Sequence, residues 1–227
     1  KFLYIRFRST KHFSAELYVD ILKQGWDVPS TNLNTGLTMI LNLSQSIEEI
    51  KNKLSSNWKR NLKRSNKHPT LIRQVYDPLF IIQAYNELQK YKSLKKSELF
   101  SDKEIKSLIK SFADDIYVFA VFDNDNNITA IRGCITHAKV GYDIFAATSE
   151  LGRKTYASHE LFLFLINHCK EMGCFYYDLN GIDPSKNMGV YNFKQGTGAK
   201  PKKQLGEFDW SNNTIFKNLV QFLIKYK

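Results

Sequence analysis

Residues Tyr176–Trp210, YYDLNGIDPSKNMGVYNFKQGTGAKPKKQLGEFDW, decide how this chain folds. The aromatic run that ends in Asp178 predicts a short buried strand, and the Asn-Gly and Asp-Pro pairs that follow it are turn sequences. Residues 187–194 can then form about two turns of helix, with one side that packs and another that presents Tyr191 and Lys194. The stretch therefore predicts a strand, a reversal and a short helix that carries polar groups.

Glycines are concentrated in and beside this stretch. Glycines that follow a short helix often cap its C-terminus, where a lysine also meets the helix dipole favourably. Glycine also permits close approach of the backbone to a ligand. The spacing of these glycines favours a capping role but leaves both interpretations open. Five of the chain's eleven glycines lie here: Gly181, Gly189, Gly196, Gly198 and Gly206.

The order of motifs D-x-x-G-I-D, G-V-Y-N-F-K and L-G-E-F-D resembles the C-terminal signature of the FemABX (Fem-type peptidyltransferase) family. The resemblance extends upstream to Trp58–Arg64 and covers residues 44–210. Members of that family form peptidoglycan cross-bridges and share the GNAT-like fold of acyltransferases. The resemblance thus implies an α+β fold, with a mixed, largely antiparallel sheet flanked by helices. It also implies a GNAT-like transferase lobe over residues 46–227, preceded in residues 1–45 by the remnant or C-terminal part of a first similar lobe.

The resemblance implies a catalytic role for Lys194, because this residue occupies the F-K position whose lysine lies close to the transferred group in similar enzymes. A fixed cation there can stabilise the charge that a carbonyl oxygen gains during acyl transfer. The sequence shows no convincing general base. Five further residues are expected to bind the substrate. Three aromatic ones, Phe193, Tyr191 and Tyr177, would shape a pocket. Either of two carboxylates, Asp178 or Asp183, could orient the amine.

A long amphipathic helix is predicted behind the S-x-x-E capping box at Ser46–Glu49, with apolar residues that recur on one face through Leu62. Its outer faces carry cations four residues apart, which repel one another. Such a row either forms a solvated surface or binds the phosphates of tRNA, CoA, a nucleotide sugar or lipid headgroups. The residues predicted to bind phosphate or tRNA are Lys59, Arg60, Lys63 and Arg64.

The rest of the sequence predicts alternating strands and helices. Three β-rich runs, at residues 116–122, 128–137 and 142–147, are joined by short polar segments that predict antiparallel hairpins. A helix at residues 155–172 and a strand at 174–179 follow. Many similar enzymes hold a nucleotide-linked substrate with an arginine between two earlier helices, where this chain has only lysines, so the resemblance leaves that specificity open. These lysines are Lys92, Lys95 and Lys96.

The composition and net charge of the chain indicate which kinds of binding partner to expect. The chain of 227 residues is 43% apolar and carries a net charge of +11, which favours an anionic partner such as nucleic acid, a phosphorylated carrier or a membrane surface. No apolar run reaches the roughly 20 residues of a membrane span, so we expect a cytoplasmic protein, with peripheral contact to the inner membrane face as one option. The first residue is Lys1, within a strand-like run, as expected of a fragment of a longer protein. The three cysteines and five histidines match no metal-ligand spacing, so we expect no metal and no bound cofactor.

Three functions remain open. The first is a Fem-like acyltransferase that moves an aminoacyl or acyl group from aminoacyl-tRNA or acyl-CoA onto an amine of a peptidoglycan or polysaccharide precursor. The second is an acyl-CoA-dependent N-acyltransferase of a nucleotide sugar or small amine. In residues 152–158, the glycines that cradle pyrophosphate in ordinary acetyl-CoA enzymes are absent after Arg153, which argues against standard CoA binding. The third is a non-catalytic basic module that binds RNA or membranes.

Overall fold

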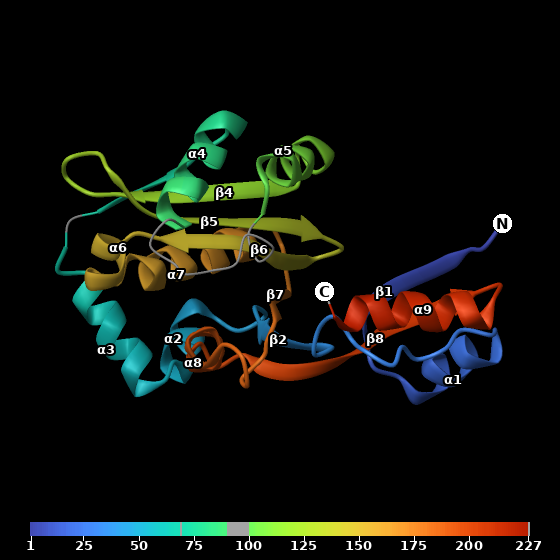
Figure 1. The fold of residues 1–227 in the computed structure, drawn as a ribbon. Coiled ribbons are helices and arrows are strands. Elements are labelled where there is room, and N and C mark those ends of the chain that lie inside the picture. The colour runs from blue at the N-terminus through green and yellow to red at the C-terminus, as the bar shows by residue number, and fades with distance from the viewer. Residues whose placement is uncertain (69, 90–99, 227) are drawn as a thin grey trace. The chain divides into compact units, whose positions relative to one another are not determined.

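The structure is a computed structural model that describes residues 1–68, 70–89 and 100–226 (Figure 1). Its contacts divide the chain into two compact units. Unit 1 comprises residues 1–39, 181–192 and 200–227, and unit 2 comprises residues 40–180 and 193–199. The predicted pair of lobes, with a boundary between residues 45 and 46, stays a prediction.

Unit 2 contains a mixed sheet in which neighbouring strands are antiparallel except for one parallel pair. The strand order is β7-β6-β5-β4-β3, and only β6 and β7 run parallel. The two hairpins predicted from short polar joins are confirmed, as is the predicted GNAT-like class of largely antiparallel sheet flanked by helices. The strands are β3 (Leu71–Gln74), β4 (Ile116–Phe122), β5 (Ile128–His137), β6 (Val140–Thr148) and β7 (Tyr176–Gly181).

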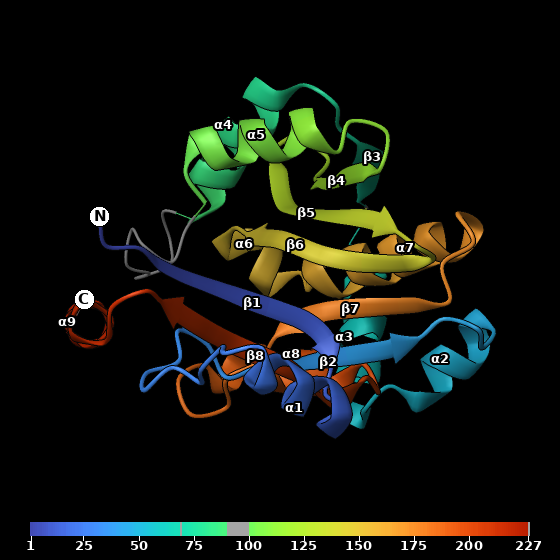
Figure 2. The ribbon, with the colours of Figure 1, turned by 90° about the vertical axis from the view of Figure 1, so that its right-hand side faces the viewer.

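Helices cover both faces of this sheet (Figure 2). Because successive residues of a strand point to opposite faces, β4 contributes to both layers. Val118 and Ala120 join the apolar core beneath α4 (Pro78–Gln89) and α5 (Asp102–Ser111). On the other face, the ring of Phe119 lies 5.1 Å from that of Phe164 in α7 (Ala157–Glu171), which follows the short helix α6 (Glu150–Lys154). The helix predicted at residues 155–172 is thus confirmed as α7. The lysines predicted between two earlier helices, Lys92, Lys95 and Lys96, lie outside the described residues.

Strands β6 and β7 separate along their length. Their pairing runs from Val140 opposite Tyr176 to Tyr142 opposite Asp178, although β6 continues to Thr148. The last residues of β7 therefore leave β6. Beyond this point the Asn180 side-chain amide donates a hydrogen bond to the Asp143 carbonyl oxygen of β6.

The single long helix predicted after Ser46 is wrong, because two helices occupy this stretch. The capping box at Ser46 does begin α2 (Ile47–Lys53), but Leu54 is extended, with ψ of 141°. Ser55 then caps α3 (Ser56–Ser65), and its hydroxyl accepts a hydrogen bond of 3.3 Å from the Trp58 N–H. A serine that satisfies the first N–H groups of a new helix competes with continuation of the old one.

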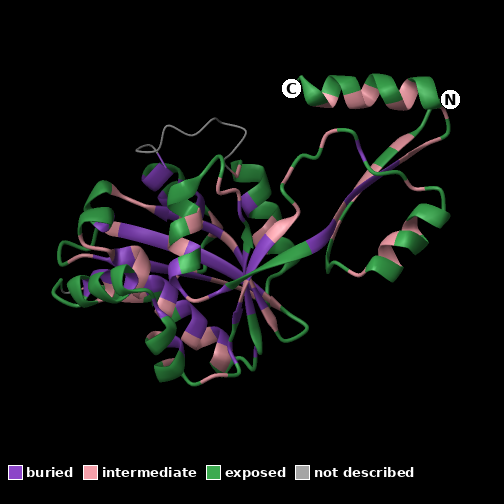
Figure 3. Ribbon diagram, turned by 90° about the horizontal axis from the view of Figure 1, so that it is seen from below, coloured by how far each residue is buried: buried purple, intermediate pink, exposed green. Residues whose placement is uncertain are grey.

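Unit 1 is built around β1 (Tyr4–His12) and β8 (Lys200–Ser211), which pair antiparallel. The ring of Phe208, fully buried on β8, lies 5.4 Å from that of Tyr18 in α1 (Ala15–Lys23). The C-terminal helix α9 (Thr214–Lys225) has no buried residue (Figure 3). Two elements, β2 (Leu37–Asn42) and α8 (Met188–Gly196), begin in unit 1 and end in unit 2. Within the described ranges, no helix combines the length and the apolar character needed to cross a membrane.

The three cysteines are free and buried. The sulfur atoms of Cys134 and Cys169 lie 3.7 Å apart. The contact with Cys169, together with burial, raises the pKa of the Cys134 thiol, and burial raises the pKa of Cys174 to about 11. Both thiols therefore stay protonated at neutral pH.

Candidate active site

Lys194 lies in the last turn of α8 with only 8% of its surface exposed. Its ammonium Nζ donates a hydrogen bond of 3.2 Å to the carbonyl oxygen of Asn180. Burial lowers the pKa of Lys194 to about 8, while Asp143 and Asp178 favour the charged form and Arg132 opposes it. The side chain is thus a buried cation near neutral pH and does not lie on an open surface.

A buried ion pair between β5 and β6 stands beside this lysine. The Arg132 guanidinium donates two hydrogen bonds, of 2.8 and 2.7 Å, to the two carboxylate oxygens of Asp143. The Tyr177 hydroxyl donates a third, of 2.9 Å, to Asp143 Oδ1. All three side chains are buried, and burial raises the pKa of Tyr177 well above its ordinary value. Such a two-pronged pair has a fixed geometry, so Asp143 holds a defined negative charge inside unit 2.

Asn180 connects Lys194 to this ion pair. Its φ of +63° places it in the left-handed region, which asparagine tolerates better than most residues. Its side-chain amide donates to the Asp143 carbonyl oxygen, and its backbone N–H donates to Asp178 Oδ1 at 2.8 Å. Because its own carbonyl oxygen accepts from Lys194, this one residue at the end of β7 orients the ammonium.

Phe193 fixes the last turn of α8 from the other side. Its carbonyl oxygen accepts a hydrogen bond of 2.9 Å from Trp58 Nε1, and its ring lies 5.2 Å from that of Trp58. Gly196 is required here, since an added Cβ would meet Trp58 Cδ1 at 2.4 Å. This glycine therefore permits close approach to a protein side chain. His159, 4.4 Å from Trp58 by ring centroids, has a pKa lowered to about 4 by burial and is neutral at pH 7.

Four predicted site residues, Tyr177, Asp178, Phe193 and Lys194, come together in unit 2, whereas Tyr191 and Asp183 belong to unit 1. Tyr191 is half-buried in α8. Asp183 Oδ1 accepts hydrogen bonds from the Ser185 hydroxyl at 2.6 Å and from the Lys186 N–H at 3.1 Å, contacts that lower the pKa of Asp183. The catalytic and substrate-binding roles of all six stay predictions.

The predicted phosphate-binding residues are all exposed on α3. Lys59 and Lys63 line a groove of about 640 Å³ whose apolar part includes Leu62 and Phe164. Arg64 donates a hydrogen bond of 2.9 Å to the Tyr156 hydroxyl, and Arg60 donates to Asn57 Oδ1 at 2.5 Å. The phosphate-binding role of Lys59, Arg60, Lys63 and Arg64 stays a prediction. Across the described part of the chain, no three His, Cys, Asp or Glu side chains are placed to hold a metal ion.

Sequence analysis missed Arg132, Asp143 and the role of Asn180. A signal was present, because each of two strands expected to be buried carries one charged residue, and the two charges are opposite. A charged group in the interior of a sheet requires a partner. The pairing of β5 with β6 places Cys134 opposite Asp143. Arg132 lies two residues before Cys134 on β5, and is therefore a diagonal neighbour of Asp143.

The sheet, its separated strands and the buried lysine define a protein of GNAT-like fold with a polar site at the end of β7. The FemAB family model matches residues 83–225, more than half of the chain, and the chain therefore belongs to the FemAB family. No curated protein matches the sequence.

Solved structures share the fold at low sequence identity. A crystal structure of FemX superposes with a TM-score of 0.81 at 12% identity, over 96% of this chain and 74% of that one. L-PGS from Bacillus licheniformis gives a TM-score of 0.60 at 12% identity, over 96% and 73% of the two chains. The C-terminal domain of a putative lysylphosphatidylglycerol synthetase from Agrobacterium fabrum gives 0.56 at 14% identity, over 92% and 69%.

Proposed function

We propose that this chain is a Fem-like acyltransferase that moves an aminoacyl or acyl group onto an amine of a cell-envelope precursor, from peptidoglycan or a polysaccharide. Membership of the FemAB family and the likeness to FemX support this proposal. The observation that carries it is the buried position of Lys194, which occupies the F-K motif and is only 8% exposed.

In the proposed reaction, the acceptor amine attacks the carbonyl carbon of an ester or thioester. As the C–N bond forms, the carbonyl oxygen gains negative charge, and the Lys194 ammonium stabilises this charge by a hydrogen bond. The interaction is stronger at a buried site than in water because the local dielectric is low. The C–O or C–S bond then breaks, and the leaving alkoxide or thiolate takes the proton that the amine loses and becomes a hydroxyl or thiol.

The remaining site residues have binding roles in this proposal. Phe193 and Tyr177 shape the acyl pocket in unit 2, where Asp178 is positioned to orient the amine, while the binding roles of Tyr191 and Asp183 in unit 1 stay predictions. Asp143 acts indirectly, because its negative charge favours the protonated form of Lys194.

Aminoacyl-tRNA is the donor that we favour over acyl-CoA. Where CoA enzymes have a glycine-rich turn before a helix, this chain has α6 and then Tyr156, whose φ is +60°. The glycine in this segment, Gly152, packs so closely that an added Cβ would lie 2.1 Å from the Thr129 carbonyl oxygen. The exposed cations Lys59, Arg60, Lys63 and Arg64 suit the phosphates of tRNA. No bound cofactor is required, and contact with the inner membrane face would bring the chain near a lipid-anchored acceptor.

A donor screen tests the proposal. The chain would be incubated with charged tRNAs or with acyl-CoA, together with amine-bearing envelope precursors, and product would be followed by mass spectrometry. Lys194→Met is expected to reduce turnover by about 10²–10³-fold, the usual cost of removing one group that stabilises the oxyanion. The matched control is Lys110→Met, which removes an exposed lysine of α5 and should leave turnover unchanged.

Each other outcome has a definite meaning. Near wild-type turnover in folded Lys194→Met would remove this lysine from the mechanism. Turnover of acyl-CoA alone would favour the N-acyltransferase alternative. Salt-dependent binding of tRNA without turnover of any donor would favour the non-catalytic module.

A further inference from the structure

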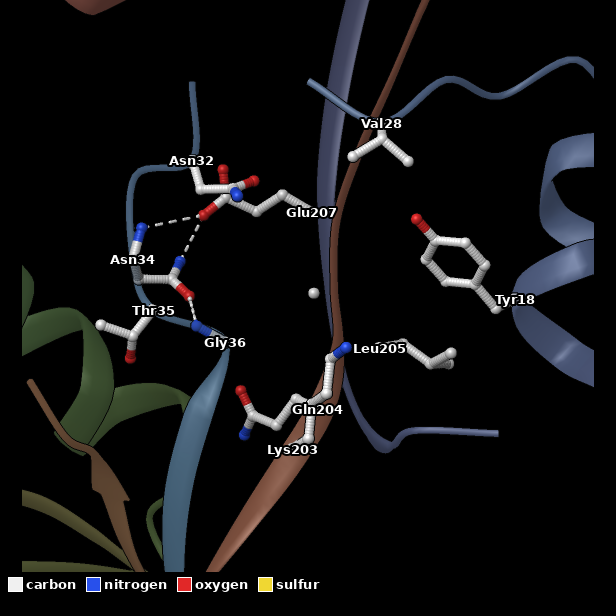
Figure 4. A pocket seen from close by; sticks show the side chains of 11 residues that line it. Tyr18, Val28, Asn32, Asn34, Thr35, Gly36, Lys203, Gln204, Leu205 and Glu207 are labelled. Carbon is white, nitrogen blue, oxygen red and sulfur yellow. Dashed lines mark hydrogen bonds between the residues drawn. The ribbon is translucent and has the colours of Figure 1, made fainter. Parts of the chain in front are cut away.

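Unit 1 contains a cavity of about 170 Å³ that the proposed reaction does not use (Figure 4). Its walls come from three parts of the unit: α1, the segment between Val28 and Gly36, and the β8 residues from Lys203 to Glu207. A cavity of about 150 Å³ can accept a ligand the size of benzene. The volume therefore fits one six-membered ring with its substituents.

A β-bulge shapes the polar wall of this cavity. Residues an odd number apart on a regular strand point to opposite faces, but Gly206, whose φ is +92°, interrupts this alternation in β8, and β1 carries one extra residue between Ser9 and His12. As a result, Gln204 and Glu207 lie on the same side of β8, facing Asn34 (Figure 4). An added Cβ at Gly206 would meet no atom within 4 Å, which shows open space at the bulge.

Glu207 makes this wall rigid. Its buried carboxylate accepts hydrogen bonds from the Leu33 N–H at 3.0 Å and from the Asn34 N–H at 3.1 Å, and the Arg6 guanidinium lies 3.6 Å away. The Asn34 side chain donates to Glu207 as well and accepts from the Gly36 N–H at 3.0 Å. The carboxylate is thus already compensated and does not require a cationic ligand.

Gln204 offers unused donors. The residue is only 2% exposed, and its Oε1 accepts a hydrogen bond of 2.8 Å from Arg8, which fixes the orientation of the amide. Among the residues that the structure describes, no acceptor is hydrogen-bonded to its Nε2 group. Because Gln204 lines the cavity, its N–H groups can donate to a ligand or to solvent there. Tyr18, which is half-buried, and Asn32, which is exposed, also line the cavity and offer a hydroxyl and an amide.

We propose that this cavity binds a neutral monosaccharide. Its donors, the Gln204 amide, the Tyr18 hydroxyl and the Asn32 amide, suit the closely spaced oxygens of a sugar, and Val28 and Leu205 suit its carbon face. An anion would lie beside the Glu207 carboxylate, with the exposed Lys203 at the same cavity, and a cation would find only a carboxylate that is already paired. The site lies within unit 1, and the inference does not depend on the proposed transfer reaction.

Binding would be measured by calorimetry on the full chain with three ligands of the same ring size: glucose, cationic glucosamine and anionic glucuronate. Glucose is expected to bind most tightly. Gln204→Glu keeps an oxygen for Arg8 but removes both N–H donors, so glucose binding should weaken about tenfold, the effect of losing one good hydrogen bond. Tyr18→Phe removes only a hydroxyl and should weaken binding several-fold.

Gln83→Glu, at an exposed position of α4, is the matched control and should bind glucose as the wild type does. Circular dichroism would establish that each variant folds, and Tyr18→Phe decides the test if Gln204→Glu does not. The inference is overturned if the wild type shows no saturable binding of glucose, if it prefers either charged sugar, or if folded variants at both positions bind glucose with unchanged affinity.

Discussion

Replacing Lys194 by methionine should make the protein more stable at neutral pH while it removes activity. Burial lowers the pKa of this lysine from its ordinary value of 10.5 to about 8. At 1.36 kcal/mol per pKa unit, keeping the ammonium charged inside the fold costs about 3 kcal/mol. Methionine has a similar length and no charge. The hydrogen bond to the Asn180 carbonyl is lost, which reduces the gain by about 1 kcal/mol. The free energy of unfolding should therefore rise by about 2 kcal/mol at pH 7.

The dependence on pH separates this explanation from a general packing effect. Below pH 8, Lys194 is protonated in both the folded and the unfolded wild type, so the full cost is present. Between pH 8 and 10.5 the folded chain releases the proton first, and wild-type stability rises by about 1.4 kcal/mol per pH unit. By pH 10 this gain reaches about 3 kcal/mol, so the variant should have lost its advantage over the wild type.

Urea unfolding at pH 7 and pH 10 would measure this difference. Trp58 reports on unit 2 by fluorescence if the other two tryptophans, Trp26 and Trp210, are replaced by phenylalanine in every variant. Lys110→Met should show no comparable change between the two pH values. If Lys194→Met is less stable than the wild type at pH 7, or if its advantage is the same at both pH values, the ammonium does not carry the cost that we assign to its burial.

Two further changes test the surroundings of Lys194. Asp143→Asn leaves the Arg132 guanidinium without its buried partner and should lower the free energy of unfolding by about 3–5 kcal/mol, measured by urea unfolding; a loss below 1 kcal/mol would show that the pair is not a rigid part of unit 2. Gly196→Ala forces a methyl group to within 2.4 Å of the Trp58 ring and should cost about 1–3 kcal/mol in thermal unfolding. Gly189→Ala in the same helix, where the added Cβ meets nothing closer than 3.9 Å, should cost nothing, and an equal loss at both positions would contradict the steric explanation.

Local sequence patterns predicted most of unit 2. The runs that became β4, β5 and β6 are rich in β-branched and aromatic residues and are joined by short polar turns, so both hairpins could be expected. The short helix that carries Lys194 and the strand before it were also expected. These elements are specified by neighbours in sequence, which is why a pattern of spacing detects them.

Elements that depend on distant partners were missed. The segment that forms β8 contains Pro201 and Gly206, which weaken a strand pattern, and its pairing partner β1 lies at the opposite end of the chain. The break between α2 and α3 was overlooked because the apolar positions continue across Ser55. The role of Asp143 depends on its ion pair with Arg132 on the neighbouring strand. The role of Asn180 depends on its position where β6 and β7 separate.

The burial of the three native thiols makes the protein suitable for site-specific fluorescent labelling. Since Cys134, Cys169 and Cys174 are all buried and free, maleimide dyes should not react with them in the native state. One surface cysteine introduced into each unit could then carry a donor and an acceptor fluorophore without first building a cysteine-free background. Energy transfer between the two dyes would follow the separation of the units in real time as tRNA or an envelope precursor is added.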